Sequence, residues 1–182
     1  MRAAFDFARK HGRKKVTVVH KANVVRATDG LFLEAAKAVA KDYPEIPMDD
    51  ANIDAMTMWL LKNPHNYDVL VAPNLYGDII SDLCAQMVGG LGFGCSGNLG
   101  ARLAVFEPTH GSAPKYAGQY KVNPIATILA VKMMLDWLGE AAKAQALEQA
   151  VARVIQDGRV RTYDLGGTST TLQMAQAIAE QL

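Results

Sequence analysis

The sequence predicts an α/β fold on three observations. Half of its 182 residues are apolar and a fifth are charged, which is the balance of a soluble globular protein with a real core. Short β-branched runs alternate with helical segments, as in α/β proteins. No apolar run approaches the ~20 residues of a membrane span, so we expect no membrane association.

The first segments alternate in this way. Residues 2–11 read as a helix that Gly12 ends, and the β-branched run 16–19 as a buried strand. Asp29 is expected to cap the next helix, which runs on until Pro44 stops it.

The middle of the chain continues with a helix over residues 51–61 and a strand over 67–72. A helix over 78–88 should follow, and the glycine-dense stretch 89–100 is expected to be loop. Residues 103–106 read as another strand.

Three helices are expected to close the chain. Asn123-Pro124 opens an apolar helix, and further helices cover about 141–156 and 168–181. Because the chain starts inside a helix with no cap or preceding strand, we expect it to be the second part of something longer.

Charge and cysteine usage exclude some classes of protein. Nineteen basic and eighteen acidic side chains give a net charge of +1, which argues against nucleic-acid binding. The first residues lack a sustained apolar core, so we expect no secretory signal. Cys84 and Cys95 lack metal-site spacing and are expected to be reduced thiols of a cytoplasmic protein.

Residues 92–97 spell a literal G-x-G-x-x-G. A dinucleotide fingerprint needs a strand before it and a helix opening at it. Here a helix precedes it and a loop follows, so we reject that interpretation.

Asp78 and Asp82 lie four residues apart at a predicted helix start, which places both carboxylates on one face. Such a pair suits Mg²⁺ or Mn²⁺. Acids are also common near helix N-termini for dipole reasons, and taken alone this simpler explanation is favoured.

Two further segments carry weaker signals. The small-residue turn 110–116 would let backbone N–H groups approach a phosphate, with Lys115 as a counter-charge. Lys21, beside His20 and Asn23, is a candidate for a lysine of lowered pKa. The alternatives are an ordinary surface turn and a solvated lysine.

Taken together, these segments resemble the isocitrate/isopropylmalate dehydrogenase family. The matching segments run in the family's order along nearly the whole chain: His20–Asn23, Asp54, Asn74–Asp82, Gly89–Gly92, Ser96–Gly100, Phe106–Pro114, Asn123-Pro124 and Asp164–Gly167. The resemblance implies a three-layer α/β/α fold of that family, of which this chain is the C-terminal part. It also implies a small, dimerising part over residues 1–88 and a nucleotide-binding large part over 89–182.

The resemblance also assigns metal and catalytic roles. Asp78 and Asp82 match metal ligands, and Asp54 matches an acid that reaches the metal of the neighbouring subunit of a homodimer with shared active sites. Lys21 matches the lysine that assists removal of the substrate's hydroxyl proton, and like Asp54 it would serve across the dimer interface. Asn23 matches a residue that contacts substrate or nicotinamide. Mg²⁺ or Mn²⁺ and the lysine would then stabilise the charge that develops during decarboxylation.

The resemblance assigns nucleotide binding to the turn 110–116 and its neighbours. The implied cofactor residues are His110, Gly111, Ser112, Ala113, Pro114, Lys115, Tyr116, Val122, Asn123 and Tyr163. Four of these residues resemble the set that prefers NADP: Lys115, Tyr116, Val122 and Tyr163. A lysine there favours the 2′-phosphate that distinguishes NADP from NAD. NAD remains the alternative cofactor. Gly167 departs from this set, since an arginine commonly stands there.

Within the family the chain looks most like isocitrate dehydrogenases of the tricarboxylic acid cycle. Isopropylmalate and homoisocitrate dehydrogenases remain alternatives, because the residues that grip the substrate belong to the family's N-terminal half. A non-catalytic nucleotide-binding or assembly fragment is a further alternative. We expect the isolated chain to expose apolar surface that needs a partner.

Overall fold

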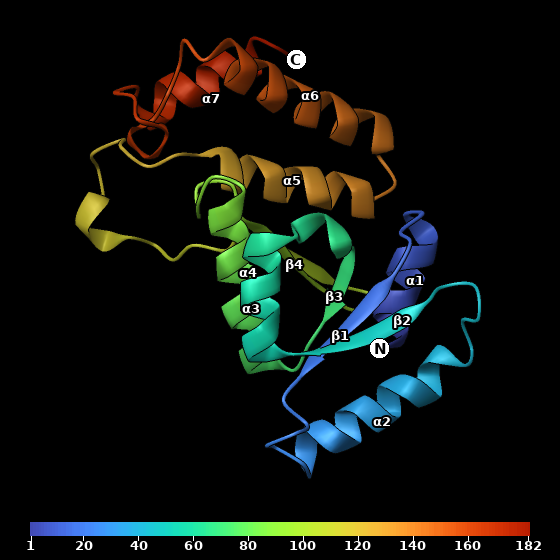
Figure 1. The fold of residues 1–182 in the computed structure, drawn as a ribbon. Helices are drawn as coiled ribbons and strands as arrows, with labels where there is room; N and C mark the ends of the chain where they lie inside the picture. The colour runs from blue at the N-terminus through green and yellow to red at the C-terminus, as the bar shows by residue number, and fades with distance from the viewer. The chain divides into compact units, whose positions relative to one another are not determined.

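The computed structural model describes residues 1–182, which divide into two compact units, 1–84 and 85–182 (Figure 1). Unit 1 contains, in order, α1 (Arg2–Lys10), β1 (Val16–His20), α2 (Thr28–Ala40), β2 (Met48–Asn52), α3 (Ile53–Lys62), β3 (Val69–Val71) and the start of α4 (Asn74–Met87). Unit 2 contains the end of α4, then β4 (Cys95–Leu99), β5 (Ala104–Pro108), α5 (Ile125–Trp137), α6 (Ala141–Asp157) and α7 (Thr171–Ala179). The predicted α/β fold is confirmed.

Unit 1 is built on a three-stranded parallel sheet of order β2-β1-β3. The central strand β1 pairs with both neighbours, and all five of its residues are buried. The helices α2 and α3 connect the strands, as parallel pairing requires. All three strands therefore end at the same edge of the sheet.

The two faces of this sheet carry separate apolar cores. Val16 and Val19 point to opposite faces because side chains alternate along a strand. Val16 packs with Phe5 of α1, while Val19 packs with Met56 of α3 and Ile80 of α4. Unit 1 is thus a layer of helix, a sheet and a second layer of helices (Figure 1).

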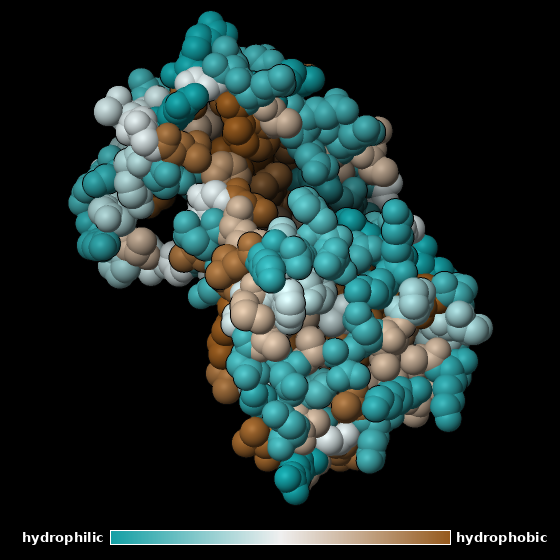
Figure 2. All heavy atoms as spheres, viewed as in Figure 1, coloured by the Kyte–Doolittle hydropathy of each residue, from teal (hydrophilic) through white to brown (hydrophobic).

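Unit 2 combines an antiparallel two-stranded ribbon with three helices. β4 pairs with β5, and α5 packs against both strands and against α6. The core of this unit is apolar and consists of Ile125, Ala150, Val151, Val154, Met174 and Ile178. Figure 2 shows apolar side chains gathered among these helices.

Two strands differ from the sequence prediction. Residues 48–52 form β2, although their letters Met-Asp-Asp-Ala-Asn have low strand propensity. Residues 95–99 form β4 inside the stretch expected to be loop. In both cases pairing with a neighbouring strand supplies backbone hydrogen bonds that outweigh local preference.

The predicted cap of α2 is also wrong. The N-cap residue is Ala27, which makes no side-chain cap hydrogen bond, and Asp29 lies inside the first turn. The Asp29 carboxylate instead accepts a hydrogen bond from the backbone N–H of Lys21, across the loop that follows β1.

Neither cysteine is in a disulfide, as expected. None of the helices is long and apolar enough to cross a membrane.

Candidate active site

The candidate catalytic and metal-binding residues follow the carboxyl ends of the three parallel strands. Lys21 comes directly after β1, Asp54 is the second residue of α3 after β2, and Asp78 and Asp82 lie on α4 after β3. Because parallel strands end together, this edge is where α/β proteins gather functional groups. Side chains distant in sequence are thereby placed on one side of unit 1.

Lys21 and Asp54 form an ion pair within one chain. The Lys21 Nζ donates to Asp54 Oδ1 at 2.5 Å, with Lys21 mostly buried and Asp54 mostly exposed. This hydrogen bond is the main reason that the pKa of the Asp54 carboxyl is lowered. The Asp54 carboxylate therefore lies directly beside the Lys21 Nζ.

The other predicted residues of unit 1 lie in solvent. Asp78 and Asp82 are exposed, four residues apart on one face of α4, and Asn23 is exposed in the loop after β1. No group of three metal-ligating side chains forms within one chain. The structure thus brings Lys21 and Asp54 together, whereas the meeting of Asp54 with Asp78 and Asp82 stays a prediction about paired subunits.

Unit 2 contains a cavity of about 540 Å³ that most of the predicted cofactor residues line. This volume is within the usual range for small-molecule sites. Eight of the ten predicted residues line it, whereas Pro114 and Lys115 do not: His110, Gly111, Ser112, Ala113, Tyr116, Val122, Asn123 and Tyr163. Its remaining walls come from Gln86, residues 89–92 and Asp164.

Asn123 holds two walls of the cavity together. Its buried side chain donates from Nδ2 to Asp164 Oδ2 at 2.9 Å and accepts from the Ile125 N–H at 3.0 Å at the start of α5. Thr162, which is fully buried, donates to the other Asp164 oxygen. A Cβ at Gly92 would lie 2.6 Å from Asp164 Oδ2, so a side chain there would break this arrangement.

The small-residue turn 110–116 is held in a strained conformation. His110 Nδ1 donates to the Gly111 carbonyl at 2.9 Å. Ala113 has φ +43°, in the left-handed region that L-residues rarely adopt. Such strain is common where a backbone must fit a ligand, and it agrees with a binding role for this turn.

Two lysines lie against two tyrosines that line the cavity. The Tyr116 and Tyr163 rings are 6.0 Å apart, with Lys121 Nζ 5.1 Å and 4.9 Å from their centres. Lys115 Nζ lies 4.9 Å from the Tyr116 ring. Neither lysine has a carboxylate partner among the ion pairs of the chain.

Sequence reasoning assigned no role to Lys121 or Asp164: Lys121 adjoins the predicted residue Val122, and Asp164 opens a segment that matches the family without an assigned function. At Gly167, the structure explains why no side chain stands there. A Cβ at this position would come within 2.2 Å of the Arg161 carbonyl oxygen. The backbone of this turn therefore excludes an arginine at 167.

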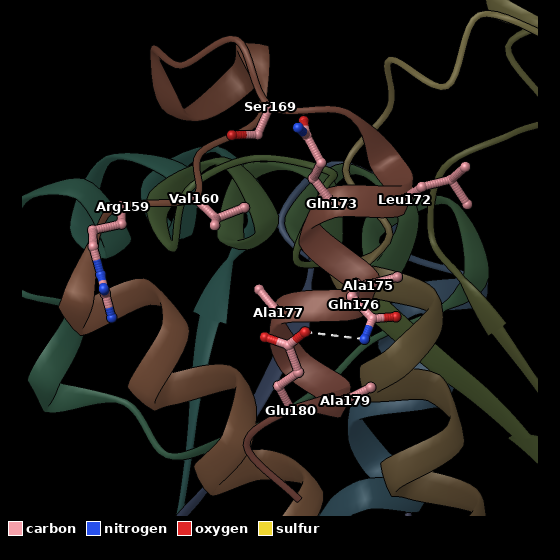
Figure 3. Close-up of a pocket in the computed structure, with 10 residues that line it drawn as sticks. All are labelled: Arg159, Val160, Ser169, Leu172, Gln173, Ala175, Gln176, Ala177, Ala179 and Glu180. Carbon is pink, nitrogen blue, oxygen red and sulfur yellow. Dashed lines mark hydrogen bonds between the residues drawn. The ribbon is translucent and has the colours of Figure 1, made fainter.

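A larger cavity, about 910 Å³, lies beside α7 and contains none of the predicted residues (Figure 3). Its charged groups are already satisfied: Arg159 pairs with Asp157, and Gln176 donates to Glu180. It has no convergent unpaired groups, so we place the candidate site elsewhere.

The fold and these residues are those of a metal-dependent dehydrogenase family. The family model of isocitrate/isopropylmalate dehydrogenases matches residues 1–180, and the chain belongs to that family.

Individual relatives and a solved structure show how similar the chain is to known proteins. The chain is 52% identical over 167 residues to a probable NAD isocitrate dehydrogenase subunit alpha, mitochondrial, of Caenorhabditis elegans, covering 92% of this chain and 47% of the relative. It is 48% identical over its whole length to a 3-isopropylmalate dehydrogenase of Archaeoglobus fulgidus, covering 55% of that protein. The crystal structure of isocitrate dehydrogenase from Methylococcus capsulatus superposes with a TM-score of 0.96 at 50% identity, over 99% of this chain and 54% of that one. The chain thus spans about half the length of the relatives it matches.

Proposed function

We propose that this chain supplies the cofactor-binding and metal-binding part of a dehydrogenase that oxidatively decarboxylates isocitrate with NADP. The observation that carries the proposal is the cavity of about 540 Å³ lined by eight of the ten expected cofactor residues. Its size suits part of a dinucleotide, and its walls offer backbone groups, a histidine and two tyrosines.

The preference for NADP rests on charge. Lys115 and Lys121 lie against Tyr116 without carboxylate partners, so their charge is free to meet a 2′-phosphate. NAD is the alternative, since several relatives, including the one from C. elegans, are named as NAD enzymes. A cofactor without the 2′-phosphate would leave this positive charge unmatched.

The acids fit a hard divalent cation. Asp78 and Asp82 offer exposed carboxylate oxygens from one face of α4, and oxygen ligands suit Mg²⁺ or Mn²⁺. A bound cation would supply stabilisation of negative charge on the reacting oxygen. Lys21 would hold its proton at Nζ close to that oxygen, kept in place by Asp54.

We further propose that two copies share their sites. One chain offers only two acids on α4, and Asp54 with Lys21 forms a separate ion pair. A second copy would bring its own Asp54 and Lys21 to the acids of the first. A homodimer of this kind would be complete only with the substrate-gripping segment of the family.

The decisive experiment measures NADPH formation from isocitrate with Mn²⁺, using this chain alone and mixed with the N-terminal half of a relative. We expect turnover only in the mixture, and its absence there would overturn the proposal. Calorimetry should show NADP binding about tenfold tighter than NAD. Lys115→Ala should remove most of this difference, because charged hydrogen bonds contribute about 1.5–3 kcal/mol, while Lys143→Ala should not.

A second substrate is favoured by one comparison. The relative from A. fulgidus, 48% identical over the whole chain, is named as a 3-isopropylmalate dehydrogenase, and one from Thermus thermophilus as an isocitrate/homoisocitrate dehydrogenase. The same assay with isopropylmalate and homoisocitrate separates these activities. Nucleotide binding without turnover on any of the three would identify a non-catalytic fragment instead.

A further inference from the structure

Asp29 is a buried carboxylate that the proposed chemistry does not use. It lies in the first turn of α2 and is 6% exposed. Its Oδ2 accepts the backbone N–H of Lys21 at 2.7 Å, eight residues earlier. A buried acid of this kind needs strong partners, and a charged acceptor binds an N–H more strongly than a neutral one.

The amides that follow β1 lack strand partners. The register of β1 with its neighbours ends at His20, so the N–H groups of Lys21 and Ala22 need other acceptors. Asp29 accepts the first, and His20 Nδ1 accepts the second at 3.0 Å. His20 Nε2 then donates to Asp50 Oδ2 at 2.9 Å. Side chains, rather than the sheet, hold this loop.

We infer that Asp29 is a positioning residue that holds the backbone of Lys21 in place at the end of β1. The inference rests on the proposed function, because it concerns the lysine placed there as catalytic. Asp29 hydrogen-bonds the Lys21 backbone, while the Lys21 ammonium is bound to Asp54. Loss of the carboxylate would leave the lysine present but free to move.

The first test measures hydrogen exchange at residues 20–23 of the chain by mass spectrometry. Asp29→Asn should speed exchange at the Lys21 amide about tenfold or more, because the charged acceptor is gone. Asp49→Asn is the matched control: Asp49 pairs with Lys15 on the same sheet and should change exchange there less than about twofold. Unchanged exchange in Asp29→Asn would overturn the inference.

The second test measures steady-state kinetics in the reconstituted enzyme. Asp29→Asn should lower kcat about tenfold and leave KM for NADP unchanged, since the nucleotide cavity is lined by unit 2 alone. In a Lys21→Ala background the same change should lower kcat no further. An equal further loss there would show a merely structural role.

Failure of the proposed function is distinguishable from failure of this inference. A wild-type mixture without turnover overturns the function, and the exchange experiment still decides whether Asp29 holds the Lys21 backbone. If Asp29→Asn does not fold, Asp29→Glu keeps the charge and displaces the carboxylate by one methylene. In this variant the Lys21 backbone amide should exchange hydrogen faster than in the wild type. An exchange rate equal to that of the wild type would contradict the inference.

Discussion

The two units hold their candidate functional residues in different ways. Unit 1 presents Lys21, Asp54 and the acids of α4 from the ends of a sheet whose central strand is buried along its whole length. Unit 2 builds its cavity from loops, joined by the buried side chains of Asn123 and Thr162. The first arrangement depends on apolar packing, and the second on polar contacts and close-packed glycines.

This difference has a physical consequence for each site. A sheet fixes the strand ends to which side chains are attached, so a few hydrogen bonds suffice to orient them. A loop has no ladder, and every backbone group near the cavity needs its own partner. The cavity of unit 2 should therefore respond to substitutions that remove no apolar contact.

The largest expected effect is in the apolar core of unit 1. Phe5→Ala should lower the free energy of unfolding by about 3–5 kcal/mol, because Phe5 is fully buried and stacks on Tyr43 at 4.7 Å. Urea unfolding measures this. Phe7→Ala, at a half-exposed position of the same helix, is the control and should cost less than about 1 kcal/mol. Equal costs would show that the core does not support this unit.

A comparable effect is expected from a single methyl group in unit 2. Gly167→Ala should cost about 2–4 kcal/mol and weaken NADP binding, because its Cβ would meet the Arg161 carbonyl oxygen at 2.2 Å, next to the turn that carries Tyr163. Gly166→Ala is the matched control, because a Cβ at this position would have open space around it. The only cost there is the backbone φ of +73°, which should lower the free energy of unfolding by about 1–2 kcal/mol. If both variants unfold at the same urea concentration, the close packing of this turn is unimportant.

A smaller effect is expected at the start of α7. Thr170 and Gln173 form a capping box, in which each side chain binds the other's backbone N–H. Thr170→Ala should lower stability by about 1 kcal/mol, measured by urea unfolding. Thr168→Ala, two residues earlier and outside the helix, should leave it unchanged. A similar loss in both variants would mean that the cap adds nothing to unit 2.

The smallest effect concerns a surface ion pair of unit 1. The pKa of the Glu45 carboxyl is lowered by a hydrogen bond from its own backbone and then by Arg9, whose Nε donates at 2.8 Å. Because the pKa of this carboxyl is lower in the folded state than in the unfolded state, its charged form stabilises the fold at any pH above the unfolded-state pKa. This stabilisation is lost as the pH falls through the folded-state pKa. At neutral pH, the melting temperature of Glu45→Gln should be slightly lower than that of the wild type. In acid, the two melting temperatures should be the same. A difference that persists in acid would exclude the ion pair as its cause, and Glu34→Gln is the control.

Much of the fold was predictable because local signals agreed with the final packing. The run 16–19 is β-branched and became the buried centre of the sheet, and the apolar helix after Asn123-Pro124 begins at Ile125. The strands 48–52 and 95–99 were not predictable in the same way, since neither is apolar. They are strands because a partner strand lies beside them.

The candidate site divides along the same line. The sequence by itself determined which residues carry charge, where the acids 78 and 82 share a helix face, and that a turn of small residues follows His110. These properties depend on residue type and on spacing within one element. They require no knowledge of what lies nearby.

Only the tertiary structure decided which of these groups meet. It paired Lys21 with Asp54, bound Asp29 to the Lys21 backbone instead of the end of its own helix, and placed Lys121 between two tyrosines. Each contact joins segments separated along the chain. Their proximity follows from strand order and loop packing, which no local spacing encodes.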